Sequence, residues 1–97
     1  MIWQRKYNEQ MISVAYAPRF VRQYKKFSRS LRDEIKRRIH LFKSDSSDPR
    51  LKVHKLHGGL NGKWSFSVDY KYRIAFKYLS DNEVILLAVD DHDIYKK

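Results

Sequence analysis

Three hydrophobic runs in the second half of the chain constrain its fold more than any other feature. In residues 64–68 and 72–78, apolar side chains occupy every second position. Because the side chains of a strand point alternately to its two faces, this spacing predicts two strands with one buried and one open face. Residues 84–89 are nearly all apolar, which is typical of a central strand. Turns are expected at residues 69–71 and 79–82.

The first half of the chain predicts one more strand and two helices. Residues 11–16 alternate with a period of two, and Pro18 then suits the first turn of a helix. The apolar residues that follow recur at helical spacing, namely Phe20, Tyr24, Phe27, Leu31, Ile35, Ile39 and Phe42. Ser30 and the aspartate three residues later resemble a capping arrangement, which predicts a break between two helices near residues 28–30. Residues 44–49 end the second helix.

Together these elements predict an α+β fold of order β-α-α-β-β-β. A helical hairpin would pack on one face of a small, mainly antiparallel sheet. The 97 residues, 42% hydrophobic and 14% aromatic, suffice for a single domain with its own core. We expect this domain to span residues 11–97. Residues 1–10 show neither period and are interpreted as an N-terminal extension of uncertain status.

Charge and composition narrow the function. The chain has no cysteine and no apolar run near the roughly 20 residues that span a bilayer, so we expect a cytoplasmic protein without a membrane partner. Its net charge is +10, with 21 Lys and Arg against 11 Asp and Glu, and basic residues crowd the segment 19–43. A solvated helix face is the plain explanation, but the size of the excess favours nucleic acid or an acidic protein as partner.

A basic segment with histidines and glycines leads into the first of the three runs. It holds Lys52, His54, Lys55, His57, Gly58, Gly59 and Gly62. Glycines permit the close approach of another backbone, and imidazoles can move protons near neutral pH. The open face of the sheet is expected to carry Ser65, Ser67, Arg73 and Lys77, and the tail holds His92 and Tyr95. Beside so much positive charge, this combination suggests phosphodiester chemistry.

Two stretches of the sequence resemble a known family. They are HKLHGGLNGKWSFSVDYKYRIAF at 54–76 and DDHDIY at 90–95. With the order of elements, they resemble the RelE/ParE toxin superfamily of bacterial toxin–antitoxin pairs, most closely the RelE/YoeB/YafQ/HigB-like messenger-RNA endonucleases. The resemblance covers residues 11–95. It implies a RelE-like fold and cleavage of mRNA, commonly on the ribosome, without a metal or other cofactor. It also implies a cognate acidic antitoxin and a toxin that is monomeric when free.

The resemblance also implies roles for individual residues. His54 matches a loop histidine of YafQ-like members, and Arg73 the strand arginine that binds the scissile phosphate. His92 matches the C-terminal histidine or arginine, and Tyr95 the terminal aromatic near the substrate base. These four are the expected catalytic residues, and the expected RNA-binding residues are Lys52, Lys55, Ser67 and Lys77.

Two departures from the family leave the general base open. Ser67 stands where YafQ-like enzymes have a second histidine, and the YoeB-type glutamate has no counterpart. Metal-free cleavage by the adjacent 2′-hydroxyl needs a base, a positive charge at the phosphorane and an acid for the 5′-oxygen. Arg73 keeps its proton and therefore suits the charge role. His54 and His92 could divide the proton roles between them.

Other interpretations of these residues and of the function are open. His57 and His40 are more typical of surface or structural histidines than of catalytic ones. The aspartates beside His92 do not have the convergent spacing of a metal site, so no metal is expected. The main alternative function is a ParE-like, non-enzymatic toxin that inhibits DNA gyrase with the same fold. A catalytically silent relative or a DNA-binding module is a third possibility.

Overall fold

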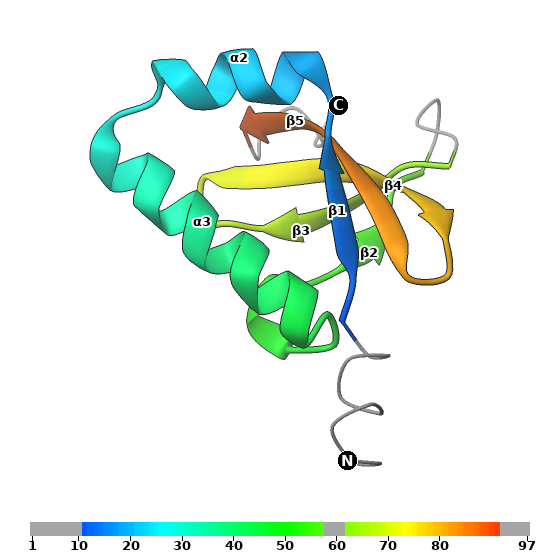
Figure 1. Ribbon diagram of the computed structural model, residues 1–97. Coiled ribbons are helices and arrows are strands. Elements are labelled where there is room, and N and C mark those ends of the chain that lie inside the picture. The colour runs from blue at the N-terminus through cyan, green and yellow to red at the C-terminus, as the bar shows by residue number, and fades with distance from the viewer. Residues whose placement is uncertain (1–10, 58–61, 92–97) are drawn as a thin grey trace, which may run out of the picture.

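The computed structural model describes residues 11–57 and 62–91. Residues 1–10, two of the three glycines and the tail with His92 and Tyr95 lie outside the described residues. Figure 1 shows two helices packed against one sheet, which confirms the predicted α+β fold. The elements in chain order are β1 (Ser13–Tyr16), α2 (Pro18–Lys26), α3 (Arg29–Ser44), the 3-10 helix η1 (Pro49–Leu51), β2 (His54–Lys55), β3 (Trp64–Ser67), β4 (Tyr72–Ser80) and β5 (Glu83–Asp91).

The sheet has five strands in the order β1-β5-β4-β3-β2. Strand β1 pairs with β5 in parallel, and the other neighbours are antiparallel. Strand β5 therefore has a partner on both sides, which explains its nearly continuous apolar sequence. The edge strand β2 was not predicted, and it places His54 on the sheet rather than in a loop. Two exposed residues are too few to show a strand period, so the sequence pattern could not reveal it.

The two helices are separated by a short extended link. Helix α3 begins at Arg29, and the side chain of Ser28 caps it by accepting a hydrogen bond from the backbone N of Leu31 at 3.2 Å. The prediction that Ser30 is the cap is wrong, because Ser30 already lies in the first turn of α3. The ring of Phe27 lies 5.9 Å from that of Tyr72, and this contact holds the link against the sheet.

The core lies between the helices and one face of the sheet. Helix α3 contributes Ile35, Ile39 and Phe42, as its helical spacing predicted. The ring of Phe42 stacks on Phe66 with centroids 4.5 Å apart and meets Phe76 edge-on at 5.0 Å. Burying side chains of this size contributes roughly 1.5–3 kcal/mol each, so these contacts fix α3 over the middle of the sheet.

A side chain of α2 makes the hydrogen bonds that a neighbouring strand would otherwise make with the end of β5. Strand β1 ends where Tyr16 pairs with Leu86. Beyond it, Gln23 donates from Nε2 to the carbonyl of Val89 at 3.0 Å, and its Oε1 accepts from the N–H of Val89 at 2.8 Å. The pairing of β4 with β5 is irregular here, since Ala75 pairs with Ala88 but the next residue pairs with Leu86. One extra residue in β5 thus bulges, and Leu86 and Val89 both reach the core.

The other face of the sheet carries the polar residues. Ser67, Arg73 and Lys77 lie there, as predicted, opposite the aromatic side chains of β3 and β4. Ser65 departs from the prediction because it is fully buried, between its cross-strand partners His54 and Ala75, and its Oγ has no hydrogen-bond partner. None of the helices in the described part of the chain is long and apolar enough to cross a membrane.

Candidate active site

A histidine and an arginine meet on the polar face of the sheet. His54 lies on the edge strand β2 opposite Ser65 of β3, and Ser67 of β3 lies opposite Arg73 of β4. The two side chains reach across β3 toward one another, and Nη1 of Arg73 lies 3.3 Å from Nε2 of His54. This contact brings together two of the residues predicted to be catalytic.

The second ring nitrogen of His54 fixes the tautomer. Nδ1 lies 2.9 Å from the carbonyl oxygen of Lys52. A carbonyl oxygen can only accept a hydrogen bond, and a guanidinium can only donate one. Both contacts of His54 are satisfied by the neutral ring with its proton on Nδ1 and the lone pair of Nε2 directed at Arg73. The ring is therefore oriented as a proton acceptor beside a permanent cation.

Lys52 holds His54 through an uncommon backbone conformation. Its φ and ψ are 49° and 46°, in the left-handed region that few residues other than glycine adopt. It follows η1 directly, and its N–H donates to the carbonyl of Pro49 at 3.3 Å. Leu51, the last residue of η1, is fully buried in the core. The position of the Lys52 carbonyl is thus set by a turn that is anchored in the core.

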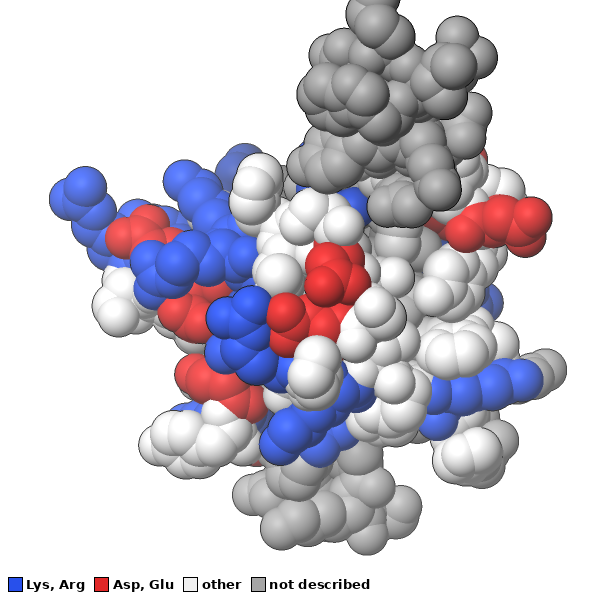
Figure 2. All heavy atoms as spheres, turned by 90° about the horizontal axis from the view of Figure 1, so that it is seen from below, with Lys and Arg blue, Asp and Glu red and all other residues white. Residues whose placement is uncertain are grey.

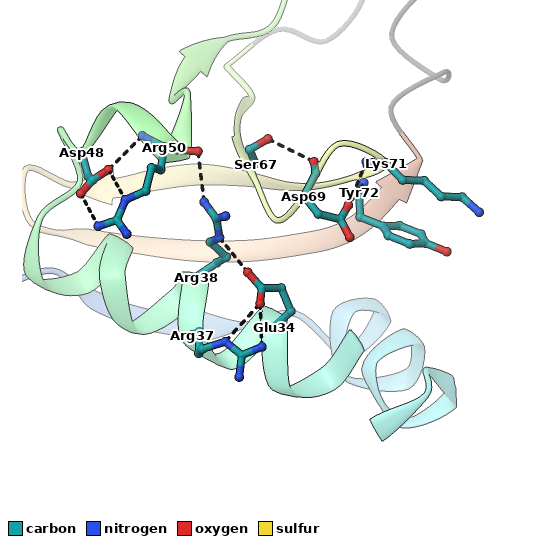
Figure 3. Close-up of polar contacts among 9 residues, drawn as sticks. All are labelled: Glu34, Arg37, Arg38, Asp48, Arg50, Ser67, Asp69, Lys71 and Tyr72. Atoms are coloured by element: carbon teal, nitrogen blue, oxygen red, sulfur yellow. Dashed lines mark hydrogen bonds and ion pairs between the residues drawn. The ribbon is translucent and has the colours of Figure 1, made fainter. Parts of the chain in front are cut away.

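A side chain of helix α3 also holds η1 in place. Arg38 extends from α3 to the backbone of η1, where its Nη1 donates to the carbonyl of Arg50 at 3.1 Å (Figure 3). Its Nε bonds Oε2 of Glu34 at 3.0 Å, and Arg37 bonds Oε1 of the same carboxylate at 2.7 Å. Hydrogen bonds from Arg37 and then Arg38 lower the pKa of Glu34. The carboxylate keeps its charge and orients Arg38 toward η1.

An ion pair between Asp48 and Arg50 stabilises η1. Asp48 precedes it and accepts from the backbone N of Arg50 at 2.9 Å. Its two carboxylate oxygens also accept from Nε and Nη2 of Arg50 at 3.0 and 2.8 Å. The hydrogen bonds from Arg50, first those of its side chain, lower the pKa of Asp48 to about 2, and the same pair raises the pKa of Arg50. Asp48 is therefore ionised at any pH at which the protein would act.

The histidine–arginine pair borders a basic groove of about 530 Å³. Its walls come from α3, η1, β3, β4 and the turn between β3 and β4. The basic lining residues are Arg38, Arg50, Lys52 and Arg73; Ser67, Val68, Asp69 and Tyr70 complete the lining. Five of these, Arg38, Arg50, Val68, Asp69 and Tyr70, were not predicted as site residues. Their meeting depends on how η1 packs on α3, which no local sequence pattern records.

The other predicted residues lie around the groove or away from it. Ser67 lines it, and its Oγ donates to the carbonyl of Asp69 at 3.4 Å. Lys55 pairs with Trp64 and so lies on the opposite face of β2 from His54. Lys77 shares the face of Arg73 but lies four residues further along β4, about 13 Å away. Neither lysine lines the groove.

Of the other three histidines, two lie within the described residues. His40 and His57 are exposed and take no part in the groove. His92, like Tyr95, lies outside the described residues, so its predicted role stays a prediction. Within residues 11–57 and 62–91, no three histidine or carboxylate side chains come together as metal ligands would.

Charge is spread unevenly over the surface. In Figure 2, Lys and Arg side chains gather on the side of the molecule on which α3 lies, with acidic side chains among them. Glu34 pairs with Arg38 and Asp48 pairs with Arg50, and both arginines line the groove. The excess of positive charge over the whole chain remains +10. Such a surface attracts polyanions.

The fold is similar to that of several solved toxins. The YoeB/ParE toxin from Agrobacterium tumefaciens matches at a TM-score of 0.67 and 15% identity, over 84% of this chain and 99% of that one. YafQ from E. coli strain BL21(DE3) matches at 0.68 and 15%, over 86% and 96%. YoeB in the YoeB–YefM complex from Staphylococcus aureus matches at 0.67 and 18%, over 84% and 97%. No family model and no curated protein matches the sequence. The chain therefore shares the fold of these toxins, which is the fold that the sequence resemblance implied.

Proposed function

We propose that this chain is the toxin of a type II toxin–antitoxin pair and acts as a metal-independent endoribonuclease. Its substrate would be mRNA, bound on the ribosome, and its cleavage would stop translation in the cytoplasm. The observation that carries the proposal is the contact of Arg73 with Nε2 of His54 at the edge of a basic groove. The fold shared with YoeB and YafQ supports the toxin role.

In the proposed reaction, the scissile phosphate binds Arg73. A guanidinium can donate two parallel hydrogen bonds to phosphate oxygens and stabilise the charge that develops on them. When the phosphate takes the N–H groups of Arg73, Nε2 of His54 loses its present donor and becomes free to accept another proton. The adjacent 2′-hydroxyl of the RNA is the group that it would deprotonate.

The bond changes follow from this arrangement. The 2′-oxygen forms a bond to phosphorus as its proton passes to His54, and the bond from phosphorus to the 5′-oxygen breaks. The leaving 5′-oxygen takes a proton from an acid, which we assign to His92 as predicted from the sequence. The products are a 2′,3′-cyclic phosphate and a 5′-hydroxyl. DNA lacks the nucleophile and would not react.

The partner of the toxin would be an acidic antitoxin. Support comes from the S. aureus structure, in which a protein of this fold forms a complex with YefM. In this chain the basic residues of α2 and α3 offer a surface for an acidic segment that folds on binding. Such a segment would also cover the polar face of the sheet, and the toxin would be monomeric when free.

Incubation with translating ribosomes and a reporter mRNA tests the proposal. The wild type should cut the message, and the Arg73→Ala variant should leave it intact under the same conditions. A DNA gyrase supercoiling assay run with the same preparations should show no inhibition. Intact mRNA together with inhibited gyrase would contradict the proposal and favour a ParE-like toxin.

A further inference from the structure

The turn between β3 and β4 presents an exposed tyrosine to the groove. Tyr70 is 93% exposed, which is the largest exposed fraction among the large hydrophobic residues of the described part of the chain. It contributes nothing to the core, yet it lines the same groove as Arg38 and Arg50. Solvent exposure of a whole aromatic ring costs free energy, so a surface that keeps one in a basic groove suggests a ligand.

Hydrogen bonds hold the turn that carries Tyr70. Oδ1 of Asp69 accepts hydrogen bonds from the backbone N of Lys71 and of Tyr72, each at 2.8 Å (Figure 3). The N–H of Val68 donates to the carbonyl of Tyr72 at 2.9 Å. These bonds tie both ends of the turn together around Tyr70. They also engage Oδ1 of Asp69, the acidic residue among the groove's lining residues. The tyrosine is thus displayed on a fixed support.

Two arginines that line the groove offer N–H donors. Asp48 takes Nε and Nη2 of Arg50, and no bond joins Nη1 of Arg50 to a described residue. Arg38 uses Nε and Nη1 toward Glu34 and the Arg50 carbonyl, which leaves its second Nη without a bond to a described residue. Both guanidinium groups are held in place by these partners. They can therefore bind a phosphate oxygen with little further ordering.

The groove is larger than one phosphate requires. Pockets for small organic ligands run from roughly 300 to 1,000 Å³, and this groove of about 530 Å³ falls inside that range. Arg73 lines the groove, and His54 contacts Arg73. The part of the groove that Tyr70, Arg38 and Arg50 line remains for another part of the substrate.

We propose that this space binds the nucleotide next to the scissile phosphate, with its base stacked on Tyr70 and its phosphate facing Arg38 and Arg50. The inference rests on the proposed function and adds to it the form of the substrate. A base can stack on a side chain only when it has left its neighbours, so the RNA in the groove is single-stranded. Stacking accepts every base, so this subsite grips the strand without setting sequence preference.

Single-turnover cleavage of ribosome-bound mRNA tests the subsite. The variants are Tyr70→Ala, Tyr70→Phe and Tyr70→Trp, with Tyr78→Ala as the control. Tyr78 is also an exposed tyrosine, but it lies at the far end of β4 from Arg73. Tyr70→Ala should raise the half-saturating concentration about ten- to a hundredfold, because stacking contributes about 1–3 kcal/mol per base. The two aromatic variants and the control should behave as the wild type.

A second series identifies the nucleotide. Messages that carry one abasic position each, moved along the cleavage site, are cut by the wild type and by Tyr70→Ala. At one position beside the cut, the abasic change should weaken the wild type as much as Tyr70→Ala does and should not weaken that variant further. Equal saturation of Tyr70→Ala and wild type, or an equal abasic penalty for both at every position, would overturn the subsite while cleavage itself stands. A wild type that cuts no message would instead overturn the proposed function, and the subsite with it.

Discussion

Nη1 of Arg73 lies 3.3 Å from Nε2 of His54, although the two residues are 19 positions apart in the chain. The sheet brings the two residues together, because β3 lies between β2 and β4. A permanent cation and a proton acceptor thus meet over the same strand. A phosphate bound to the arginine would release the lone pair of the histidine. The proposed chemistry follows from this release.

Replacing Arg73 tests its role in stabilising charge, with the fold checked separately. Arg73→Ala should reduce mRNA cleavage at least about a hundredfold, in the range found when a preorganised charge-stabilising donor is removed. Arg73→Lys should recover only part of the loss, because an ammonium cannot grip a phosphate with two parallel bonds. Circular dichroism should show the wild-type fold for both variants. A loss of activity that accompanies unfolding would remove this support for the assignment.

His54 is expected to affect the chemical step. His54→Ala should lower the single-turnover rate at saturating enzyme by about 10²–10⁴-fold, the usual contribution of a positioned base. The half-saturating concentration should change little, since the ring is proposed to take a proton rather than to bind the strand. The control is Lys55→Ala, which alters the next residue of β2 on its opposite face. If His54→Ala instead weakens binding and leaves the saturated rate unchanged, His54 is not the base.

Gln23 should matter for stability. Its amide pairs with both backbone groups of Val89, which is 4% exposed. Gln23→Ala leaves these groups without their partners, and an unsatisfied buried polar group costs about 1–3 kcal/mol. We expect the free energy of unfolding in urea to fall by this order. Arg22→Ala, an exposed change on the same helix, should leave it within about 0.5 kcal/mol of the wild type. Equal stability of the two variants would contradict the role of Gln23.

The Asp48–Arg50 pair predicts a pH dependence with a definite sign. The pKa of Asp48 falls from 3.8 to about 2 in the folded protein, so folding favours the ionised carboxylate. Its contribution to stability is present above pH 3.8 and is lost as the pH falls toward 2. Asp48→Asn should therefore lower the urea midpoint at pH 6, and the difference from the wild type should shrink below pH 4. A difference that stays constant from pH 6 to pH 2.5 would show that the ion pair is not its cause.

The sequence predicted the parts of this fold that repeat with a clear period. The helical spacing of Ile35, Ile39 and Phe42 and the alternation in β3 and β4 are set by burial against one core, and both were confirmed. Strand β2 has only two residues and shows no period. The start of α3 was placed two residues late, because Ser28 and Ser30 are equally good caps when judged from local sequence.

The site was predictable only where single residues carry a distinctive chemistry. Arg73 and His54 could be singled out, since an arginine on the polar face of a strand and a histidine in a basic segment stand out in the sequence. Arg38 looked like one more basic residue of a solvated helix face. Its place beside the groove depends on its bond to the carbonyl of Arg50, a contact between residues that are 12 positions apart. Such contacts arise from tertiary packing, which periodicity does not encode.

The most direct test of the central claim uses one modified nucleotide. A message with a 2′-deoxy sugar at the cleaved position is presented on ribosomes to the wild-type protein, beside the unmodified message. The account predicts that the unmodified RNA is cut to a 2′,3′-cyclic phosphate and a 5′-hydroxyl, and that the single deoxy substitution abolishes the cut at that position. Cleavage of the deoxy-substituted message at the same bond would contradict attack by the 2′-hydroxyl and the roles given to His54 and Arg73.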